Sequence, residues 1–305
     1  MIIKRISLVL LLLAIALFMQ WSCIPDLENG SKEEAYSYPL DVGNSWKYDF
    51  NLRSENYRKY ISDSNFIPVD TVVLNDSMTE QVTVDRVDST TVDVATMVMR
   101  DSMWNSALAD TTQNSAASRF WYRNNPDGLY MYAYISTGHS AMPKKTVTQG
   151  IRYKGMVFVN ASSLAAYFIE KANTCRAKHL SAASSPTVYP TPRKILLYPY
   201  SADSLWDFDP DDSTIRIARK YIGKERISCK AGTFTCYKIQ WLWDWESDGI
   251  WDDDREEYDW ISPKYGLIKR AICLHDFEEW TEGGIVAKFD WIQEYQATEI
   301  SIKGR

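Results

Sequence analysis

The sequence predicts a mainly β protein in which one helix lies against a curved antiparallel sheet. Two observations carry this prediction. Apolar and polar residues alternate with a period of two, most clearly in "YKIQWLWDW" at residues 237–245, and this is the pattern of a half-buried strand. Turn signals separate such runs at intervals suited to hairpins, at Asp127-Gly128, Lys230-Ala231-Gly232, Asp248-Gly249 and Ser262-Pro263.

Residues 1–22 have the composition of a signal for export. A short basic start precedes an apolar run over residues 6–19, which is shorter than the roughly 20 residues that a transmembrane helix needs. The following Ser22-Cys23 resembles the end of a bacterial lipoprotein signal, in which Cys23 is lipidated and becomes the new N-terminus, although Gln20 stands where an aliphatic residue is usual. Cleavage near Ser22 and an uncleaved anchor are the alternatives. We therefore expect an exported protein, held by lipid in the bacterial envelope, with the outer membrane as its expected site.

The remaining chain divides into a short tether and a body. Residues 23–36 are polar and are predicted to be a flexible tether, and residues 37–305 are predicted to form a single β-rich domain. Within that domain we expect a loop at about 102–118, which is rich in Ser, Thr and Ala, and an exposed linker at about 181–193.

One segment of about 16 residues is predicted to be helical, at about residues 162–178. Ser162 or Ser163 can cap its start, because a hydroxyl oxygen accepts a hydrogen bond from a free backbone N–H there. Apolar residues then recur at helical spacing, at Leu164, Tyr167, Phe168, Ala172 and Cys175.

Charge and motifs argue against two large classes of function. The formal net charge of −6 disfavours nucleic acid as a partner, because a phosphate backbone requires a basic face. The three histidines have no metal-binding spacing, and neither a nucleophile elbow nor a phosphate-binding glycine loop is present. We therefore expect a protein that is not an enzyme.

The cysteines leave two readings open. If Cys23 carries lipid, four cysteines remain, and an oxidising compartment permits disulfides. Cys229 and Cys236 flank "KAGTFT", where a hairpin could place them opposite each other in a disulfide. The alternative is that all four are buried free thiols.

Three stretches resemble a known group of proteins. "YPLDVGNSWKY" at residues 38–48 resembles the opening of many bacterial envelope lipoproteins, and "KAGTFTCYKI" followed by "WISPKYGLIKR" at residues 260–270 is similar to their second half. These proteins are grouped with the LolA/LolB-like architecture. The resemblance implies a strongly curved antiparallel sheet, like an unclosed barrel, with helix on its concave side. The matching motifs are turns, so they speak to fold more than to function.

The stretch "WDWESDGIWDDD" at residues 243–254 resembles the first part of a calcium loop. Oxygen ligands at alternate positions, a glycine at the sixth and an acid at the twelfth define such a loop. The candidate ligands are the side chains of Asp244, Glu246, Asp248, Asp252 and Glu256 and the carbonyl of Ile250. Arg255 occupies the twelfth position and excludes a helical calcium hand. The remaining alternatives are a calcium-stabilised hairpin loop and a solvated acidic tip; Ca2+ is the one cofactor that the sequence suggests.

Trp241, Trp243 and Trp245 are predicted to form an aromatic wall on one strand face. Such a wall can line the cavity of an apolar ligand such as a lipid, stack on carbohydrate, or fill the core. The sequence therefore favours a non-catalytic envelope lipoprotein that binds a hydrophobic ligand or an envelope protein on the concave face of its sheet. The alternative is a structural or adhesion-type surface lipoprotein with a calcium-stabilised acidic loop.

Overall fold

The computed structural model describes residues 36–62, 65–70, 75–104, 117–135, 149–154, 156–158, 185–211 and 215–304. Residues Ser37–Arg305 form one compact unit. The predicted signal peptide, the lipidation site Cys23 and the predicted helix at 162–178 lie outside the described residues, as do residues 23–35 of the tether.

The regular structure of the described residues consists of strands alone, and none of these residues belongs to a helix that could span a lipid bilayer. The described residues form fifteen strands. Their bounds are Ser45–Ser62 (β1), Asn65–Pro68 (β2), Asn75–Asp88 (β3), Thr96–Trp104 (β4), Ala117–Asn125 (β5), Gly128–Ile135 (β6), Gln149–Tyr153 (β7), Met156–Phe158 (β8), Thr187–Leu197 (β9), Leu205–Asp207 (β10), Arg216–Cys229 (β11), Gly232–Asp244 (β12), Arg255–Ser262 (β13), Gly266–Thr281 (β14) and Gly284–Ser301 (β15).

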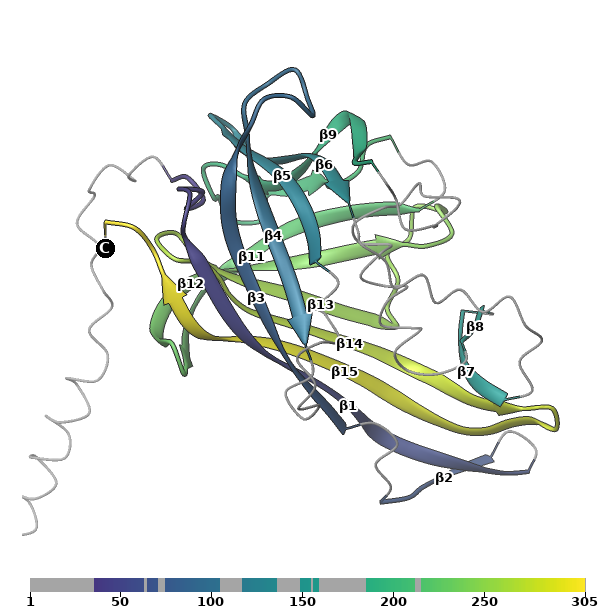
Figure 1. Ribbon diagram of the computed structural model, residues 1–305. Helices are drawn as coiled ribbons and strands as arrows, with labels where there is room; N and C mark the ends of the chain where they lie inside the picture. The colour runs from purple at the N-terminus through teal and green to yellow at the C-terminus, as the bar shows by residue number, and fades with distance from the viewer. Residues whose placement is uncertain are drawn as a thin grey trace, which may run out of the picture. The chain divides into compact units, whose positions relative to one another are not determined.

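The strands form a single antiparallel sheet, which confirms the predicted fold class at this level. The order along the sheet is β10-β11-β12-β13-β14-β15-β1-β3-β4-β5-β6-β9, with β2 paired to β1 and β7 paired to β14 and β8 (Figure 1). Most neighbours in the sheet are also neighbours in the sequence, and short turns join β5 to β6, β11 to β12, β13 to β14 and β14 to β15. The sequence could therefore predict the hairpins from their turn residues.

The two ends of the sheet meet without a backbone ladder between them. Trp206 of β10 donates from Nε1 to the carbonyl of Lys194 in β9, over 3.1 Å. Arg219 of β11 donates to the carbonyl of Ile195 in β9. Side chains thus close the sheet into a nearly complete, barrel-shaped ring, and the side chains of its inner face surround one interior.

The predicted opening motif at residues 38–48 forms the start of β1. Gly43 has φ of 96°, a conformation that glycine adopts without steric cost. Asn44 is fully buried; its amide nitrogen donates to the carbonyl of Pro39 over 3.0 Å, and its Oδ1 accepts from the backbone N–H of Lys303 over 2.8 Å. Asn44 therefore fastens the beginning of the domain to its end.

The predicted linker at 181–193 needs correction, because β9 begins inside it. Thr187 and Val188 pair with β6, as does Arg193, whose side chain is buried. The ladder is irregular between Val188 and Arg193, where Pro190 and Pro192 stand. Prolines are tolerated at an irregularity of an edge strand, so these residues did not end the strand as the sequence suggested. The predicted loop at 102–118 overlaps a strand at each end, because β4 runs to Trp104 and β5 starts at Ala117.

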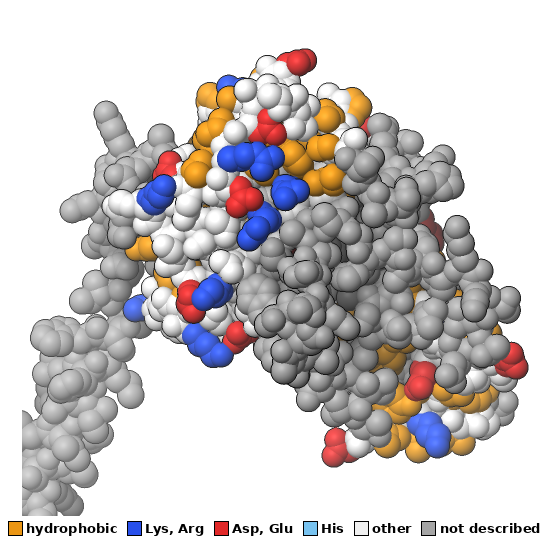
Figure 2. Space-filling view, in the orientation of Figure 1, with side chains coloured by type: hydrophobic (Ala, Val, Ile, Leu, Met, Phe, Trp, Pro, Cys, Tyr) orange, Lys and Arg blue, Asp and Glu red, His pale blue; other side chains and the backbone are white. Residues whose placement is uncertain are grey.

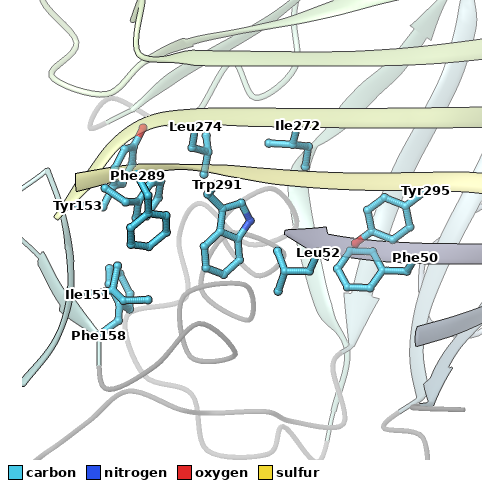
Figure 3. Packing of buried hydrophobic residues seen from close by; sticks show 11 residues of the cluster. Phe50, Leu52, Ile151, Tyr153, Phe158, Ile272, Leu274, Phe289, Trp291 and Tyr295 are labelled. Atoms are coloured by element: carbon cyan, nitrogen blue, oxygen red, sulfur yellow. The ribbon is translucent and has the colours of Figure 1, made fainter. Parts of the chain in front are cut away.

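A large apolar cluster lies along the concave face of β14, β15 and β1 (Figure 3). Trp291 and Phe289 of β15 are fully buried in it. The ring of Tyr153 stacks on that of Phe277 at a centroid distance of 4.5 Å, and this contact attaches β7 to the sheet. The candidate site described next adjoins this cluster, because Ile272 and Tyr295 belong to both.

Candidate functional site

The ring of strands encloses a cavity of about 210 Å³. Its described lining comes from β1, β3, β4, β5, β6, β9 and β11 through β15, and it is both apolar and charged. Ligand pockets for drug-sized molecules are roughly 300–1,000 Å³, so a cavity of this size suits a small ligand or the head group of a larger one.

The predicted tryptophan wall exists, but only one of its members borders the cavity. The rings of Trp241 and Trp243 are stacked at 6.4 Å, and those of Trp243 and Trp245 lie at the same centroid distance. Trp241 lines the cavity, whereas Trp243 is buried in the hydrophobic core and Trp245, which follows β12, is partly buried between two clusters. The wall thus serves the core and the cavity together.

A buried ion-pair cluster surrounds the ring of Trp241. Asp259 of β13 accepts hydrogen bonds from Arg270 Nε over 2.6 Å, from Arg270 Nη2 over 3.0 Å and from Trp241 Nε1 over 3.0 Å. Arg219 donates to the same carboxylate, and its guanidinium lies 4.2 Å from the Trp241 ring centroid. Burial by itself would raise the pKa of Asp259, but the charges of Arg270 and Arg219 outweigh it and hold the pKa below its ordinary value.

A second ion pair lies beside it in the same strand. Arg255 donates to Glu257 Oε2 from Nη2 over 2.6 Å and from Nε over 3.0 Å. Trp243 donates from Nε1 to that oxygen over 3.1 Å, and the Arg255 guanidinium lies 4.1 Å from the Trp243 ring centroid. Each of the two indoles, Trp241 and Trp243, therefore donates a hydrogen bond to a carboxylate and has a guanidinium over its ring.

Two acids face the cavity from the opposite side of the ring. Glu80 of β3 and Asp101 of β4 are hydrogen-bonded to each other. Burial raises the pKa of Glu80 well above its ordinary value, and the charge of Asp101 adds to the effect. Burial also raises the pKa of Asp101, to about 6, against the opposing influences of the Glu80 hydrogen bond and Arg270. At neutral pH the two carboxyls share one proton, because two like charges so close cannot both ionise without a large cost.

Tyrosines complete the lining between these charged groups. Burial raises the pKa of Tyr38 to about 12 and raises the pKa values of Tyr48, Tyr122 and Tyr295 as well, so the four phenols stay neutral. Tyr295 accepts a hydrogen bond from Gln293 Nε2 over 2.9 Å. The cavity thus offers neutral aromatic surfaces between a paired group of charges and a carboxyl pair.

The acidic stretch at 243–254 is arranged differently from a calcium loop. Asp244 is buried, and its two carboxylate oxygens accept from the backbone N–H groups of Asp248 and Gly249 over 3.0 and 2.9 Å. Asp252 accepts from Lys154 Nζ over 2.5 Å and from the backbone N–H of Trp245 over 3.1 Å. These carboxylates close the loop by local hydrogen bonds, which satisfies the backbone without an ion.

The other predicted calcium ligands do not converge on these two. Asp248 accepts from the N–H of Ile250, whose side chain is 71% exposed, and Glu256 points from β13 toward His275 at 3.9 Å. Glu246 is an exposed residue of the turn. Within the described ranges, no group of three or more His, Cys, Asp or Glu side chains is arranged to hold a metal ion. Calcium binding therefore stays a prediction without a ligand group in this part of the chain.

The predicted disulfide between Cys229 and Cys236 does not form. The register places Cys229 across from Gly232 and Cys236 across from Glu225, so the two cysteines are not opposite each other. Both are free thiols, as is Cys273, and burial raises the pKa of the Cys236 thiol to about 12. The turn at Lys230-Ala231-Gly232 was predicted correctly, but the strand register on either side of it does not bring the two cysteines together.

A separate surface feature lies at the far end of β1 and β2. Hydrophobic side chains are exposed there at Tyr60, Ile61 and Ile67, the last two by 56% and 47%. Figure 2 shows hydrophobic side chains beside acidic and basic ones over this end of the molecule. It is remote in the fold from the cavity, whose lining includes only Tyr48 from β1.

The sequence did not reveal the charged groups of the cavity. Glu257 and Asp259 share the alternating face of Ile261, which is buried. That shared face was the one available signal. Glu80 and Asp101 carry no such signal, because they meet only through the pairing of β3 with β4.

Comparisons with known proteins give limited matches. A family described as DUF3108-like matches residues 210–271, which include β11, β12, β13 and the start of β14. No curated protein matches the chain.

Two solved structures are similar to this chain at low scores. One is a candidate exported protein with a YmcC-like fold from Bacteroides fragilis, with 11% identity, a TM-score of 0.35 and coverage of 88% of this chain and 100% of that chain. The other is a candidate lipoprotein from Parabacteroides distasonis, with 12% identity, a TM-score of 0.34 and the same coverage of both chains. At these scores the likeness assigns neither a fold family nor a function to this chain.

Proposed function

We propose that this protein is a non-catalytic lipoprotein of the bacterial envelope that binds a small amphipathic ligand inside its curved sheet. The observation that carries the proposal is the cavity of about 210 Å³, whose lining combines aromatic and aliphatic side chains with buried charges. A few polar groups on a mainly apolar wall are typical of small-molecule binding sites.

Buried charge supports a binding role more than a purely structural one. Apolar residues of similar volume often stabilise a core as well as a buried ion pair does, or better. Here seven ionisable carboxylates and guanidiniums line one cavity, at Glu80, Asp101, Arg219, Arg255, Glu257, Asp259 and Arg270. Their concentration around one empty space favours recognition of a polar group on a ligand.

A non-catalytic role is favoured by the kinds of side chain in the site. Among the described residues that line the cavity there is no serine, threonine, cysteine or histidine. A serine, threonine or cysteine nucleophile beside a histidine base, one common arrangement of covalent catalysis, is therefore not assembled from these residues.

The place of action follows from the start of the sequence. The basic and apolar signal at residues 1–22 followed by Cys23 supports export and a lipid anchor, and the outer membrane is the destination we propose. The LolA/LolB-like resemblance agrees with a curved sheet that binds an apolar molecule on its concave side. The alternative, an adhesion-type lipoprotein with a calcium-stabilised loop, has less support because Asp244 and Asp252 are already engaged by local donors.

The proposal is tested by filling the cavity. Val82 of β3 lines it, whereas Val87 of the same strand is 53% exposed. The full chain is purified in a mild neutral detergent and its mass is measured under native conditions, as wild type, Val82→Phe and Val87→Phe. We expect a co-purified small molecule in wild type and Val87→Phe and its loss in Val82→Phe, with both variants folded by circular dichroism. Wild type without any bound molecule, or equal retention by Val82→Phe, would contradict the proposal.

A further inference from the structure

The starting observation is the carboxyl pair formed by Glu80 and Asp101. Asp101 is directly paired with Val82 in the β3–β4 ladder, so Glu80 is its diagonal neighbour on the same face. Both residues line the cavity. Glu80 Oε2 and Asp101 Oδ1 are buried atoms without a hydrogen-bond donor. A buried acceptor left unsatisfied in this way is unfavourable, because it has lost its hydrogen bonds to water without replacing them.

The other charges of the cavity are already matched. Arg219 and Arg270 both bond to Asp259, and Arg255 bonds to Glu257. None of the salt bridges between described residues involves Glu80 or Asp101, and only a shared proton holds these two carboxyls together. The described lining therefore has four acids and three guanidiniums, and the acid in excess belongs to this pair.

The surroundings of the pair would accept a cation and not an anion. Tyr48, Tyr122 and Tyr295 face it from β1, β5 and β15, and their phenols stay neutral because burial raises their pKa values. The charged group that acts on it across the cavity is Arg270, whose guanidinium is already paired with Asp259. Aromatic faces attract a desolvated cation through the negative charge of their π-electrons.

We infer that the ligand of this cavity carries one protonated amine or a cation of similar size, which replaces the proton shared by Glu80 and Asp101. An ammonium group supplies three N–H donors and one positive charge, whereas the shared proton supplies a single hydrogen bond. The exchange balances: the ammonium enters and one proton leaves to water. This inference rests on the proposed function, since it names the chemical class of the ligand for the same cavity.

The test uses three probes that share a six-carbon chain: hexylammonium, hexanoate and 1-hexanol. Each is titrated into the full chain in a neutral detergent at pH 7, with binding followed by tryptophan fluorescence, because Trp241 borders the cavity. We expect hexylammonium to bind about tenfold tighter than 1-hexanol, and hexanoate to bind more weakly than both. The affinity for hexylammonium should fall as the pH is lowered, since each ammonium that binds must displace the proton of the carboxyl pair.

The variant Glu80→Gln/Asp101→Asn keeps the shape of both side chains and removes their charge. We expect it to bind hexylammonium about tenfold more weakly than wild type and to bind 1-hexanol with little change. Glu299→Gln, on the exposed Lys47–Glu299 pair, is the control and should leave all three affinities unchanged. Retained 1-hexanol binding also shows that the double variant is folded.

The outcomes separate this inference from the proposed function. If none of the three probes binds wild type, the ligand-binding proposal and this inference both fail. If 1-hexanol binds but hexylammonium shows no advantage, or if hexanoate binds tightest, the cavity holds a ligand of another charge and only the inference is overturned.

Discussion

Arg219 and Asp259 form a buried ion pair across the indole ring of Trp241. Arg219 lies directly opposite Trp241 in the β11–β12 ladder, and Asp259 stands on β13, the strand beyond. Trp241 belongs to β12, the strand between these two. Its indole donates to the Asp259 carboxylate, while the Arg219 guanidinium lies over its face at 4.2 Å from the ring centroid. The tryptophan thus contributes a hydrogen bond, a cation–π contact and apolar area to one charge cluster.

The first prediction concerns this cluster. Asp259→Asn leaves the buried Arg219 and the partly exposed Arg270 without their shared carboxylate, and we expect the free energy of unfolding to fall by about 3–5 kcal/mol. Urea unfolding followed by fluorescence measures it. Glu299→Gln, which breaks an exposed pair, should lower it by no more than about 1 kcal/mol. A loss below about 1 kcal/mol for Asp259→Asn would mean that the cluster does not stabilise the fold.

The second prediction is a dependence of stability on pH. A carboxyl whose pKa is higher in the folded than in the unfolded protein binds its proton more tightly when folded. Its contribution is therefore complete below the unfolded pKa of about 3.9 and is lost as the pH rises through the folded value. For Asp101 that value is about 6, and the pKa of Glu80 is raised in the same direction.

Glu80→Gln/Asp101→Asn removes this contribution. We expect the stability of the double variant relative to wild type to improve by about 1–3 kcal/mol between pH 4 and pH 7. Urea unfolding at both pH values gives the difference. A relative stability that stays constant over this range would show that the two carboxyls titrate normally in the folded protein.

The third prediction concerns the acidic loop. Lys154 neutralises Asp252 and Asp254, at 2.5 and 3.3 Å, so Lys154→Met should destabilise the protein by about 1 kcal/mol. Lys230→Met, at a lysine 73% exposed in its pair with Asp49, should have almost no effect. Thermal unfolding measures both variants.

The same thermal unfolding measurement also tests whether the acidic loop binds calcium. Wild type should melt at the same temperature in millimolar calcium and in a chelator, because an ion that binds the folded state must raise the Tm. A rise of several degrees in calcium would restore the calcium-loop prediction.

The fourth prediction compares two glycines with similar backbone angles. Gly266 and Gly249 have φ of 79° and 89°, so alanine is strained at both by about 1–2 kcal/mol. At Gly266 an added Cβ would also lie 2.9 Å from the hydroxyl of Tyr38 and 3.3 Å from the ring of Trp46, whereas at Gly249 it would meet nothing within 4 Å. We expect Gly266→Ala to lower the free energy of unfolding by about 1–3 kcal/mol more than Gly249→Ala. Equal losses in urea unfolding would show that Tyr38 and Trp46 move aside freely.

Local patterns in the sequence predicted the strands well, but they could not predict which distant strands contact each other. The alternation at 237–245 and the turn at Lys230-Ala231-Gly232 predicted β12 correctly because both depend on residues close in the chain. The face of Trp241 could be read from that alternation. The groups that face Trp241 across the ring could not be read from the sequence, since β11, β13 and β14 converge only when the whole sheet curves.

The buried charges illustrate the same limit in energetic terms. A carboxylate such as Asp259 is expected at the surface unless a cation accompanies it into the interior. Its partners Arg219 and Arg270 are 40 and 11 residues away in the sequence, and nothing local links them to it. The hydrogen bonds of Asp244 and Asp252 in the loop were equally beyond the sequence pattern, because a carboxylate can accept from backbone N–H groups as well as bind an ion.

The meeting of β9 and β10 also affects how this protein behaves beside other molecules. A free strand edge offers N–H and C=O groups to any other chain, which makes it a starting point for aggregation. Here the two free edges of the main sheet face each other, held by Trp206, Arg219 and the buried pair of Arg193 with Asp209 at 2.6 Å. Pro190 and Pro192 also remove two donors from β9. The protein thus shields these two strand edges from other chains.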